Sequence, residues 1–177
     1  MKHIIILVIA IFVSACASNV IETIERIQFN VNEYKALPKT GQFIIKGKAF
    51  LKTTDGEIKF PENYFVRLNP KTSYSEQWYN VNYVGHKNIG VADPRYFDYV
   101  YKTKTDKNGN FKFKNIPAGE YYISAPIFWM KEIPQEDGSI YQRRLGKFIC
   151  YEIIVKGDNV KVINITTEKP LNVSLDL

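Results

Sequence analysis

The chain has 177 residues and a formal net charge of +6, and 45% of its residues are hydrophobic and 14% aromatic. This composition supplies enough apolar surface for one packed core, so it argues against an intrinsically disordered chain and favours a single folded domain. The lysines are spread along the sequence and alternate with apolar residues, a pattern typical of solvated strand faces, so we expect no nucleic-acid partner. The positive charge is still compatible with acidic polymers of a cell envelope as partners.

Residues 1–15 have the pattern of an export signal peptide. A short positive start is followed by an unbroken apolar run over 4–13, and two small residues, Ser14 and Ala15, precede Cys16. The apolar run is too short to span a bilayer. We therefore expect export and cleavage of the leader.

The motif Val13-Ser14-Ala15-Cys16 resembles the lipobox of bacterial lipoproteins. The resemblance implies that the thiol of Cys16 receives a diacylglyceryl group and that Cys16 becomes the new N-terminus, so that acyl chains hold the mature protein on a membrane. Ala17 stands where inner-membrane lipoproteins tend to carry Asp, which implies the outer membrane of the bacterial cell envelope. The alternative is an ordinary secretory leader that ends in a buried cysteine.

Residues 16–42 are expected to form the lipidated N-terminus and a tether. Their hydrophobic periodicity is weak, and the segment closes in a turn-forming cluster over 37–41. One short element of uncertain type is expected within it. The tether would hold the folded domain, 43–177, away from the membrane.

The folded domain is expected to begin with a strand over 43–52. Within it, Gly47 indicates a bulge or the close approach of another backbone. The Asp-Gly pair at 55–56 predicts a hairpin turn. A further strand over 64–68 is expected to end at the Asn-Pro pair at 69–70, because the residue before proline is restricted and proline cannot donate a hydrogen bond.

Residues 71–97 are expected to form a partly helical insert. Ser73 and Glu76 have the spacing of a capping box at a helix N-terminus. Apolar side chains then recur at the spacing of a short amphipathic helix: Tyr74, Trp78 and Val81. The Asp-Pro pair at 93–94 predicts a second helix start.

Aromatic residues are concentrated in and around this insert, at a density well above the chain average over 64–101. Exposed rings could stack on sugars, and the candidate ligand-stacking residues are Trp78, Tyr79 and Tyr83. The alternative is that the rings cover the folded core and leave only some tyrosine edges at the surface. A contiguous open aromatic groove would favour a glycan ligand, and buried rings would favour a structural role.

The stretch over 103–123 organises the rest of the chain. The Asn-Gly pair at 108–109 tolerates positive φ at both central positions of a turn, and Phe111 and Phe113 alternate with lysines, so a hairpin with one apolar face is predicted. An Ile-Pro-Ala-Gly segment at 116–119 then ends the strand ladder. Three side chains are expected to point into the core: Phe111, Ile116 and Tyr121.

The remainder of the chain has a β pattern. A strand over 120–130 is expected to be broken by Pro126, and a polar turn follows at 135–138. The other expected strands are 140–155, 160–165 and 171–177. Short strands at regular turn spacing favour an all-β sandwich with Greek-key connections.

One part of the sequence resembles a known family. The matching residues are Thr105-Asp106, Gly109-Asn110-Phe111, Phe113, Ile116-Pro117-Ala118-Gly119-Glu120-Tyr121 and Ile123. This string resembles the carboxypeptidase regulatory-like domain, a small β-sandwich of transthyretin-like architecture. The resemblance implies a fold, a transthyretin-like Greek-key sandwich, and does not by itself imply an activity. The insert over 71–97 departs from a minimal domain of this family, which needs only a short connection there.

No catalytic site, metal site or cofactor is expected. Beyond the leader there is one histidine, His86, in a stretch rich in Gly and Asn, and the common hydrolase and metal motifs are absent. The segment 106–110 differs from a calcium loop because its glycine comes early and Pro117 stands where a bidentate Glu is required. Cys150 lies in an apolar strand and is interpreted as a small core residue.

The favoured function is a non-catalytic, membrane-anchored lipoprotein of the cell envelope that acts as a structural, adhesion or assembly module. The alternative is a glycan- or peptidoglycan-binding lipoprotein that uses the insert aromatics. A weaker alternative is a transthyretin-like lipoprotein of a secretion apparatus, and an envelope enzyme is the least favoured reading. The expected partners are therefore a membrane, through Cys16, and an envelope protein or a glycan.

Overall fold

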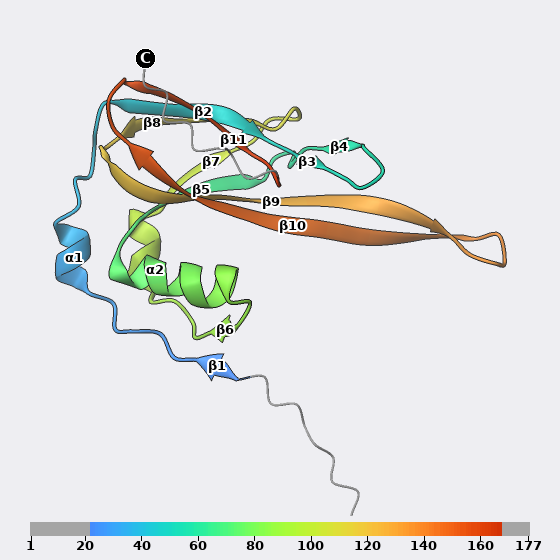
Figure 1. The fold of residues 1–177 in the computed structure, drawn as a ribbon, viewed down its shortest axis with the longest axis horizontal. Helices are drawn as coiled ribbons and strands as arrows, with labels where there is room; N and C mark the ends of the chain where they lie inside the picture. Colours follow the sequence, from blue (N-terminus) through green and yellow to red (C-terminus); the bar gives the residue numbers. More distant parts are fainter. Residues whose placement is uncertain (1–21, 168–177) are drawn as a thin grey trace, which may run out of the picture.

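The computed structural model describes residues 22–167. The leader, Cys16 and the strand expected over 171–177 lie outside the described residues. Two β-sheets pack face to face, and a layer of short helices covers the outer side of one sheet (Figure 1). The expected all-β sandwich with a small helical insert is confirmed.

The larger sheet has four antiparallel strands in the order β10-β9-β5-β7. Its strands are β10 (Ile140–Val155), β9 (Gly119–Pro134), β5 (Phe65–Pro70) and β7 (Tyr101–Lys104). The smaller sheet has the order β11-β2-β8, with β11 parallel and β8 antiparallel to β2. Its strands are β11 (Val160–Ile165), β2 (Phe43–Ala49) and β8 (Asn110–Ile116).

The main core lies between the two sheets, because alternate side chains of each strand point to the same side. The apolar residues of β2, β5, β8, β9 and β10 alternate in this way, and sixteen buried residues form one cluster there. The inward prediction for Phe111, Ile116 and Tyr121 is confirmed, since all three are buried in that cluster. The Tyr121 hydroxyl donates to the Pro117 carbonyl oxygen at 3.0 Å, which fixes the corner before β9.

Two expectations for the first strands are also confirmed. At Gly47 a Cβ atom would lie 1.6 Å from the Ile163 carbonyl oxygen, so β11 approaches β2 at a distance that only glycine permits. The pair at 55–56 turns the hairpin between β3 (Leu51–Lys52) and β4 (Ile58–Lys59).

The hairpin expected around residues 108–109 is wrong. Strand β7 pairs with β5 and strand β8 pairs with β2, so the turn between them crosses from one sheet to the other. Within the Asn-Gly pair only Gly109 has a positive φ, +77°. The turn is closed by the Asp106 carboxylate, whose Oδ1 accepts hydrogen bonds from the backbone N–H groups of Asn108 and Asn110. The sequence predicts the turn itself, but it does not predict that β7 pairs with β5 and β8 with β2.

The break expected at Pro126 is wrong as well, because β9 continues through this residue to Pro134. Strand β5 pairs with β9 only from Tyr121 to Ser124, so Pro126 lies where one side of β9 has no partner strand in the described part of the chain, and the missing N–H group is tolerated. Beyond this point β9 and β10 continue as a two-stranded ribbon, residues 127–148, which projects from the sandwich (Figure 1). We call this ribbon the arm.

The helical layer lies on the outer side of the four-stranded sheet (Figure 1). It contains α1 (Val31–Lys35), α2 (Ser73–Trp78), the π-helical segment η1 (Tyr79–Val84), the 3₁₀ helix η2 (Pro94–Tyr99) and a short parallel pairing of β1 (Thr23–Ile24) with β6 (Asn88–Ile89). The expected helix start at the Asp-Pro pair is confirmed, with Asp93 as the N-cap. The capping box differs from its prediction, because Thr72 and Ser75 form it.

The tether expected over 16–42 is wrong for its described part. Phe29 and Tyr34 are buried with Tyr74 of the insert in a second apolar cluster, and the Phe29 and Tyr34 rings stack at 4.6 Å. The Thr72 hydroxyl also donates to the Tyr34 hydroxyl at 2.7 Å. The apolar side chains of this segment are spaced irregularly, so their burial could not be read from periodicity, and the segment packs on the fold as part of the helical layer.

Candidate functional site

The candidate site is the outer face of the four-stranded sheet, next to the insert. Ile123, Ala125 and Ile127 of β9 and Ile149 of β10 point into the core, so the residues between them point outward. Directly opposed residues of an antiparallel pair share a face, and the register therefore places these outward pairs along β9 and β10: Tyr122 with Glu152, Ser124 with Cys150, Pro126 with Phe148, Phe128 with Gly146 and Met130 with Arg144.

The inner end of this face is covered by η1. The Tyr79 ring stacks on Tyr122 with centroids 4.4 Å apart and an interplanar angle of 19°, and it stacks on Tyr83 at 5.4 Å. The Tyr83 hydroxyl accepts the backbone N–H of Cys150 at 3.0 Å. Burial raises the pKa of Tyr79, and it raises the pKa of Tyr122 to about 12. These contacts fix the rings in one arrangement.

The middle of the face is formed by Phe148. Its ring makes edge contacts with Trp78 at 6.0 Å and with Tyr83 at 6.1 Å, and 38% of the residue is exposed. Strand β10 is distant in the sequence from α2 and η1. Aromatic rings from the end of α2, from η1 and from β10 therefore meet here.

The outer end of the face lies at the base of the arm. The Phe128 ring covers Gly146, since a Cβ atom on Gly146 would lie 2.0 Å from that ring. The Arg144 guanidinium stacks on the Phe128 ring with 4.3 Å to the centroid, and it donates to the Tyr64 hydroxyl at 2.9 Å. Phe128 is 37% exposed. We call Trp78, Tyr79, Tyr83, Phe128 and Phe148 the aromatic band.

The structure brings the three predicted ligand-stacking residues together. Trp78, Tyr79 and Tyr83 are all partly exposed and lie on one side of the sheet. Their rings contact one another and the sheet, which agrees with the covering role, and each residue is also partly exposed, so ligand stacking by these residues stays a prediction. Other insert aromatics, Tyr74 and Tyr96 among them, belong to the second apolar cluster and are not part of the band.

Sequence reasoning missed Phe128 and Phe148. Their alternation with core residues in β9 and β10 was a signal that both point away from the core, and the glycine at 146 was a signal that a ring could lie across the strand. What the sequence did not contain was the register that sets these strands beside η1.

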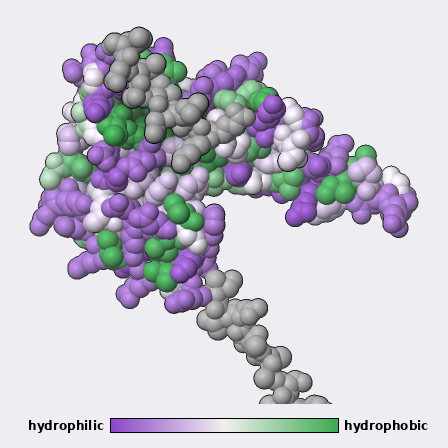
Figure 2. Space-filling model, viewed as in Figure 1, coloured by the Kyte–Doolittle hydropathy of each residue, from purple (hydrophilic) through white to green (hydrophobic). Residues whose placement is uncertain are grey.

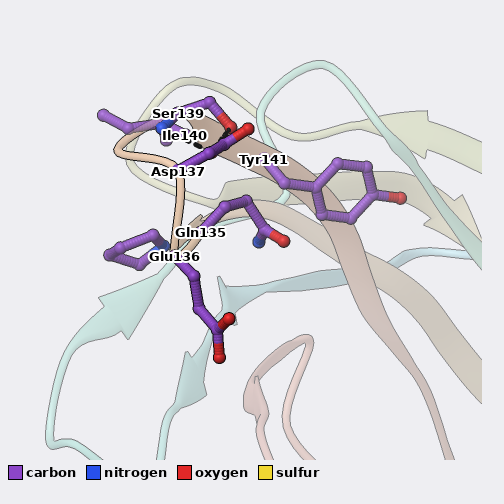
Figure 3. Close-up of a pocket in the computed structure, with 7 residues that line it drawn as sticks. Gln135, Glu136, Asp137, Ser139, Ile140 and Tyr141 are labelled. Carbon is purple, nitrogen blue, oxygen red and sulfur yellow. Dashed lines mark hydrogen bonds between the residues drawn. The ribbon is translucent and has the colours of Figure 1, made fainter.

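The surface of the described part offers open faces for a ligand. Figure 2 shows hydrophobic residues in separate patches among hydrophilic ones on the visible side. A shallow hollow lies at the tip of the arm, between Gln135 and Tyr141, where the Asp137 carboxylate accepts the Ser139 hydroxyl at 2.6 Å (Figure 3). It is made by the turn itself and is open to solvent, so a small molecule would not be enclosed there.

The residues considered for catalysis lie apart. His86 is exposed in the loop after η1, and Cys150 is buried beneath Tyr83, where burial raises the pKa of its thiol to about 12. Both Asp106 oxygens accept hydrogen bonds within their own turn, Oδ1 from two backbone N–H groups and Oδ2 from the Asn110 amide. Within residues 22–167 no three metal-binding side chains cluster, and no helix is long and apolar enough to cross a membrane.

No protein-family model matches the chain, and no curated protein sequence does. Among solved structures, it is similar to PA1324, a proposed carbohydrate-binding protein from Pseudomonas aeruginosa. The two share 30% identity with a TM-score of 0.65, over 80% of this chain and 99% of that one. A more distant likeness, with 20% identity and a TM-score of 0.36, covers 73% of this chain and 30% of BcpA, the major pilin subunit of Bacillus cereus. With almost the full length of PA1324 matched at this identity, the chain belongs to the same family as that protein.

Proposed function

We propose that this chain is a non-catalytic carbohydrate-binding protein of the bacterial cell envelope and that the aromatic band contacts the sugar. The observation that carries the proposal is the band itself, in a chain whose relative PA1324 is a proposed carbohydrate-binding protein. The flat, apolar C–H faces of sugar rings stack on aromatic side chains, which combine a large contact area with few rotatable bonds.

The geometry of the band suits this task. Tyr79 and Tyr83 are held by stacking and by the hydrogen bond from the Cys150 backbone, so little side-chain entropy remains to be lost when a ligand binds. The register places the band from η1 to Phe128 on the arm, and each of its residues is at least partly exposed. An open row of rings favours an extended polymer over a monosaccharide.

The proposal is tested by measuring polysaccharide binding with affinity electrophoresis and titration calorimetry. Trp78→Ala and Phe148→Ala should each weaken binding by about tenfold, because a ring stack in a partly exposed site is worth about 1 to 1.5 kcal/mol. The matched control is Tyr141→Ala. Tyr141 is an exposed aromatic residue of the same strand, β10, at an odd-numbered position that places it on the opposite face of the ribbon from Phe148. Unchanged affinity in both band variants, or no binding to any polysaccharide, would contradict the proposal.

Membrane anchoring is a second part of the proposal. The lipobox resemblance at Cys16 supports a lipid anchor, and Ala17 supports the outer membrane. The resemblance to the carboxypeptidase regulatory-like family supports a transthyretin-like origin of the sandwich. A sandwich of this kind, displayed from a lipid anchor, would present its aromatic band to envelope polymers.

The arm favours a second candidate function, a structural, adhesion or assembly module. It is a two-stranded ribbon that extends from the body (Figure 1), and several apolar side chains on it are exposed: Phe128, Met130, Ile140 and Tyr141. Exposed strand edges can pair with another chain. Crosslinking and pull-down from the native envelope would test this function, and Tyr141→Ala should then reduce protein capture while it leaves glycan binding unchanged. If Tyr141→Ala instead lost glycan binding and still captured every protein that the parent captures, the result would count against an assembly role.

A further inference from the structure

We infer that the carbohydrate bound at the aromatic band is an acidic polysaccharide, whose carboxylates are held by four cationic side chains on the same sheet face: Arg67, Lys102, Lys104 and Arg144. This inference rests on the proposed function and adds the chemical class of the ligand. We call these four residues the cationic flank.

The strand register places the cationic flank beside the band. Val66 and Leu68 point into the core, so Arg67 between them points outward. Arg67 lies directly opposite Lys102 on one side and Ser124 on the other, and Ser124 lies opposite Cys150. This row across the sheet therefore begins with the exposed cations Lys102 and Arg67. It ends at Cys150, whose backbone N–H donates to the Tyr83 hydroxyl.

The charges of the flank are not compensated by carboxylates. Like charges that face each other across two strands destabilise a sheet, so the Arg67–Lys102 pair is costly unless it serves another purpose. None of the ion pairs found among residues 22–167 includes a flank residue. The carboxylate of Glu152, on the same face, is already paired with Lys71.

Three flank cations are held against aromatic rings. The Lys102 ammonium lies 5.7 Å from the Phe97 ring centre, and Lys104 lies 5.3 Å from Phe65, directly across the strand pair. Arg144 stacks on Phe128 of the band. Such contacts hold the cationic groups at the surface, where an anion can reach them, and they reduce the side-chain entropy lost when an anion binds. A guanidinium fork also matches the geometry of a carboxylate.

Rings that stack on sugar faces and cations that bind carboxylates therefore share one open surface. A neutral glycan would use the rings and leave the flank unpaired. A polymer of uronic acids satisfies both, because each residue supplies an apolar ring face and one carboxylate. Charge complementarity thus selects the acidic polymer as the occupant.

The opposite sheet supplies a matched control. Lys46 and Lys112 also face each other directly, on the outer side of the three-stranded sheet, since their neighbours Ile45, Phe111 and Phe113 point into the core. In the described part of the chain neither of these two lysines stacks on a ring. Each face therefore carries a directly opposed pair of cationic residues, and only the face of the four-stranded sheet also carries the aromatic band.

The experiment compares two polymers with the same sugar backbone: polygalacturonate, whose carboxylates are charged, and its fully methyl-esterified form, which is uncharged. The unmodified protein should bind polygalacturonate at least about tenfold more tightly. The double variant R67Q/K102Q should lose about tenfold in affinity for polygalacturonate and retain its affinity for the ester. The double variant K46Q/K112Q should stay within about twofold of the parent for both polymers. Raising the salt from about 0.1 M to about 1 M shortens the screening length from about 10 Å to about 3 Å, so it should weaken only the polygalacturonate complex.

Each other outcome decides against the inference. Equal affinity for the two polymers, with loss in Trp78→Ala, would retain the proposed function and overturn the acidic ligand. Equal losses in the two double variants would show attraction to net charge alone. Binding of oligodeoxythymidylate or of phosphatidylglycerol vesicles as tightly as polygalacturonate would also overturn it, and so would failure to bind polygalacturonate. The proposed function would fall as well only if the protein bound no polysaccharide. Because R67Q/K102Q removes a repulsive pair, its melting temperature should not fall, and that measurement separates lost binding from lost folding.

Discussion

At the scale of single residues, Tyr83 joins the candidate site to the stability of the sheet. Among residues 22–167, strand β10 is an edge strand of the four-stranded sheet, so within this range backbone N–H groups on its free side have no partner strand. The Tyr83 hydroxyl accepts one of them, the N–H of Cys150, and its ring contacts Phe148. One side chain thus satisfies a backbone donor and orients the rings proposed to bind sugar.

The position of Cys150 leads to a first prediction. Its thiol is buried beneath η1, and burial raises its pKa to about 12, so the reactive thiolate is almost absent near neutral pH. In a Cys16→Ser background, Cys150 should resist alkylation by iodoacetamide at about pH 8 and react fully after denaturation, as measured by mass spectrometry. Complete labelling of the folded protein within minutes would show that the thiol is accessible and would reopen a catalytic reading.

At the scale of elements, local sequence predicted the strands and turns better than their partners. Alternation placed Phe111 and Phe113 inward, and the turn over 106–109 was recognised from its Asn-Gly pair. The same turn chemistry serves a hairpin and a crossing between sheets, and the choice depends on β2 and β5, which are distant in sequence. Local patterns contain no information about that choice.

The candidate site divides in the same way. Trp78, Tyr79 and Tyr83 could be predicted because they lie close together in a stretch of the sequence that is rich in aromatic residues. Phe148 and Arg144 were missed, because they reach the site only through the register of β10 on β9 and the packing of η1 across that register. The docking of Tyr34 was missed for a related reason, since its contacts are with the insert.

Gly47 gives a prediction at this scale. A methyl group there would lie 1.6 Å from the Ile163 carbonyl oxygen, so β11 could not keep its parallel pairing with β2. Gly47→Ala should therefore destabilise the fold by at least about 1 to 3 kcal/mol, the usual cost of forcing atoms into a packed site. Urea unfolding measures the loss.

A suitable control is Gly56→Ala, at a turn position where a Cβ atom meets nothing within 4 Å. Its positive φ of +88° adds a backbone cost of its own. The comparison therefore separates strain at a turn from a clash between strands. A smaller loss in Gly47→Ala than in Gly56→Ala would show that β11 is not held closely against β2.

At the scale of the whole molecule, the fold has three layers with two different kinds of interior. The space between the sheets is mostly aliphatic with a few rings, whereas the space between the four-stranded sheet and the helical layer is rich in tyrosine: Tyr34, Tyr74, Tyr79, Tyr96 and Tyr122. Tyrosine fits a thin layer because its ring is apolar and its hydroxyl reaches a polar partner or water. The space beneath the helical layer is consequently richer in ionisable tyrosine side chains than the space between the sheets, where Tyr121 is buried.

This arrangement predicts a loss of stability at high pH. Burial raises the pKa of Tyr34, Tyr122 and Cys150 to about 12 each, above their values in an unfolded chain. The folded state then holds these protons more tightly, so their contribution to stability is complete below the unfolded pKa values, about 8.5 for Cys and about 10 for Tyr, and is lost as pH rises toward about 12.

The urea midpoint should be constant from about pH 7 to 8 and fall progressively from about pH 9 to 11. Tyr122→Phe keeps the ring that Tyr79 stacks on and removes one ionisable group, so the fall should be less steep in that variant. A midpoint that does not change up to about pH 11 would mean that these groups are solvated in the folded protein.

The last prediction concerns display of the molecule from a membrane through Cys16. The motif Val13-Ser14-Ala15-Cys16 follows an apolar leader, and each buried methylene of an attached acyl chain contributes about 0.8 kcal/mol to membrane binding, so the chains added at one cysteine would hold the protein essentially permanently. Cys16→Ser should abolish incorporation of a fatty-acid analogue in metabolic labelling and should move the protein from the membrane fraction to the soluble one. Cys150→Ser is the control, because a buried thiol in β10 is not available to the lipid-transfer reaction. Since Phe29, Tyr34 and Leu37 pack with the insert, the segment around them does not extend as a free spacer, and we expect the aromatic band to stay close to the membrane that carries the anchor. Equal labelling of Cys16→Ser and the parent would remove both the anchor and this placement.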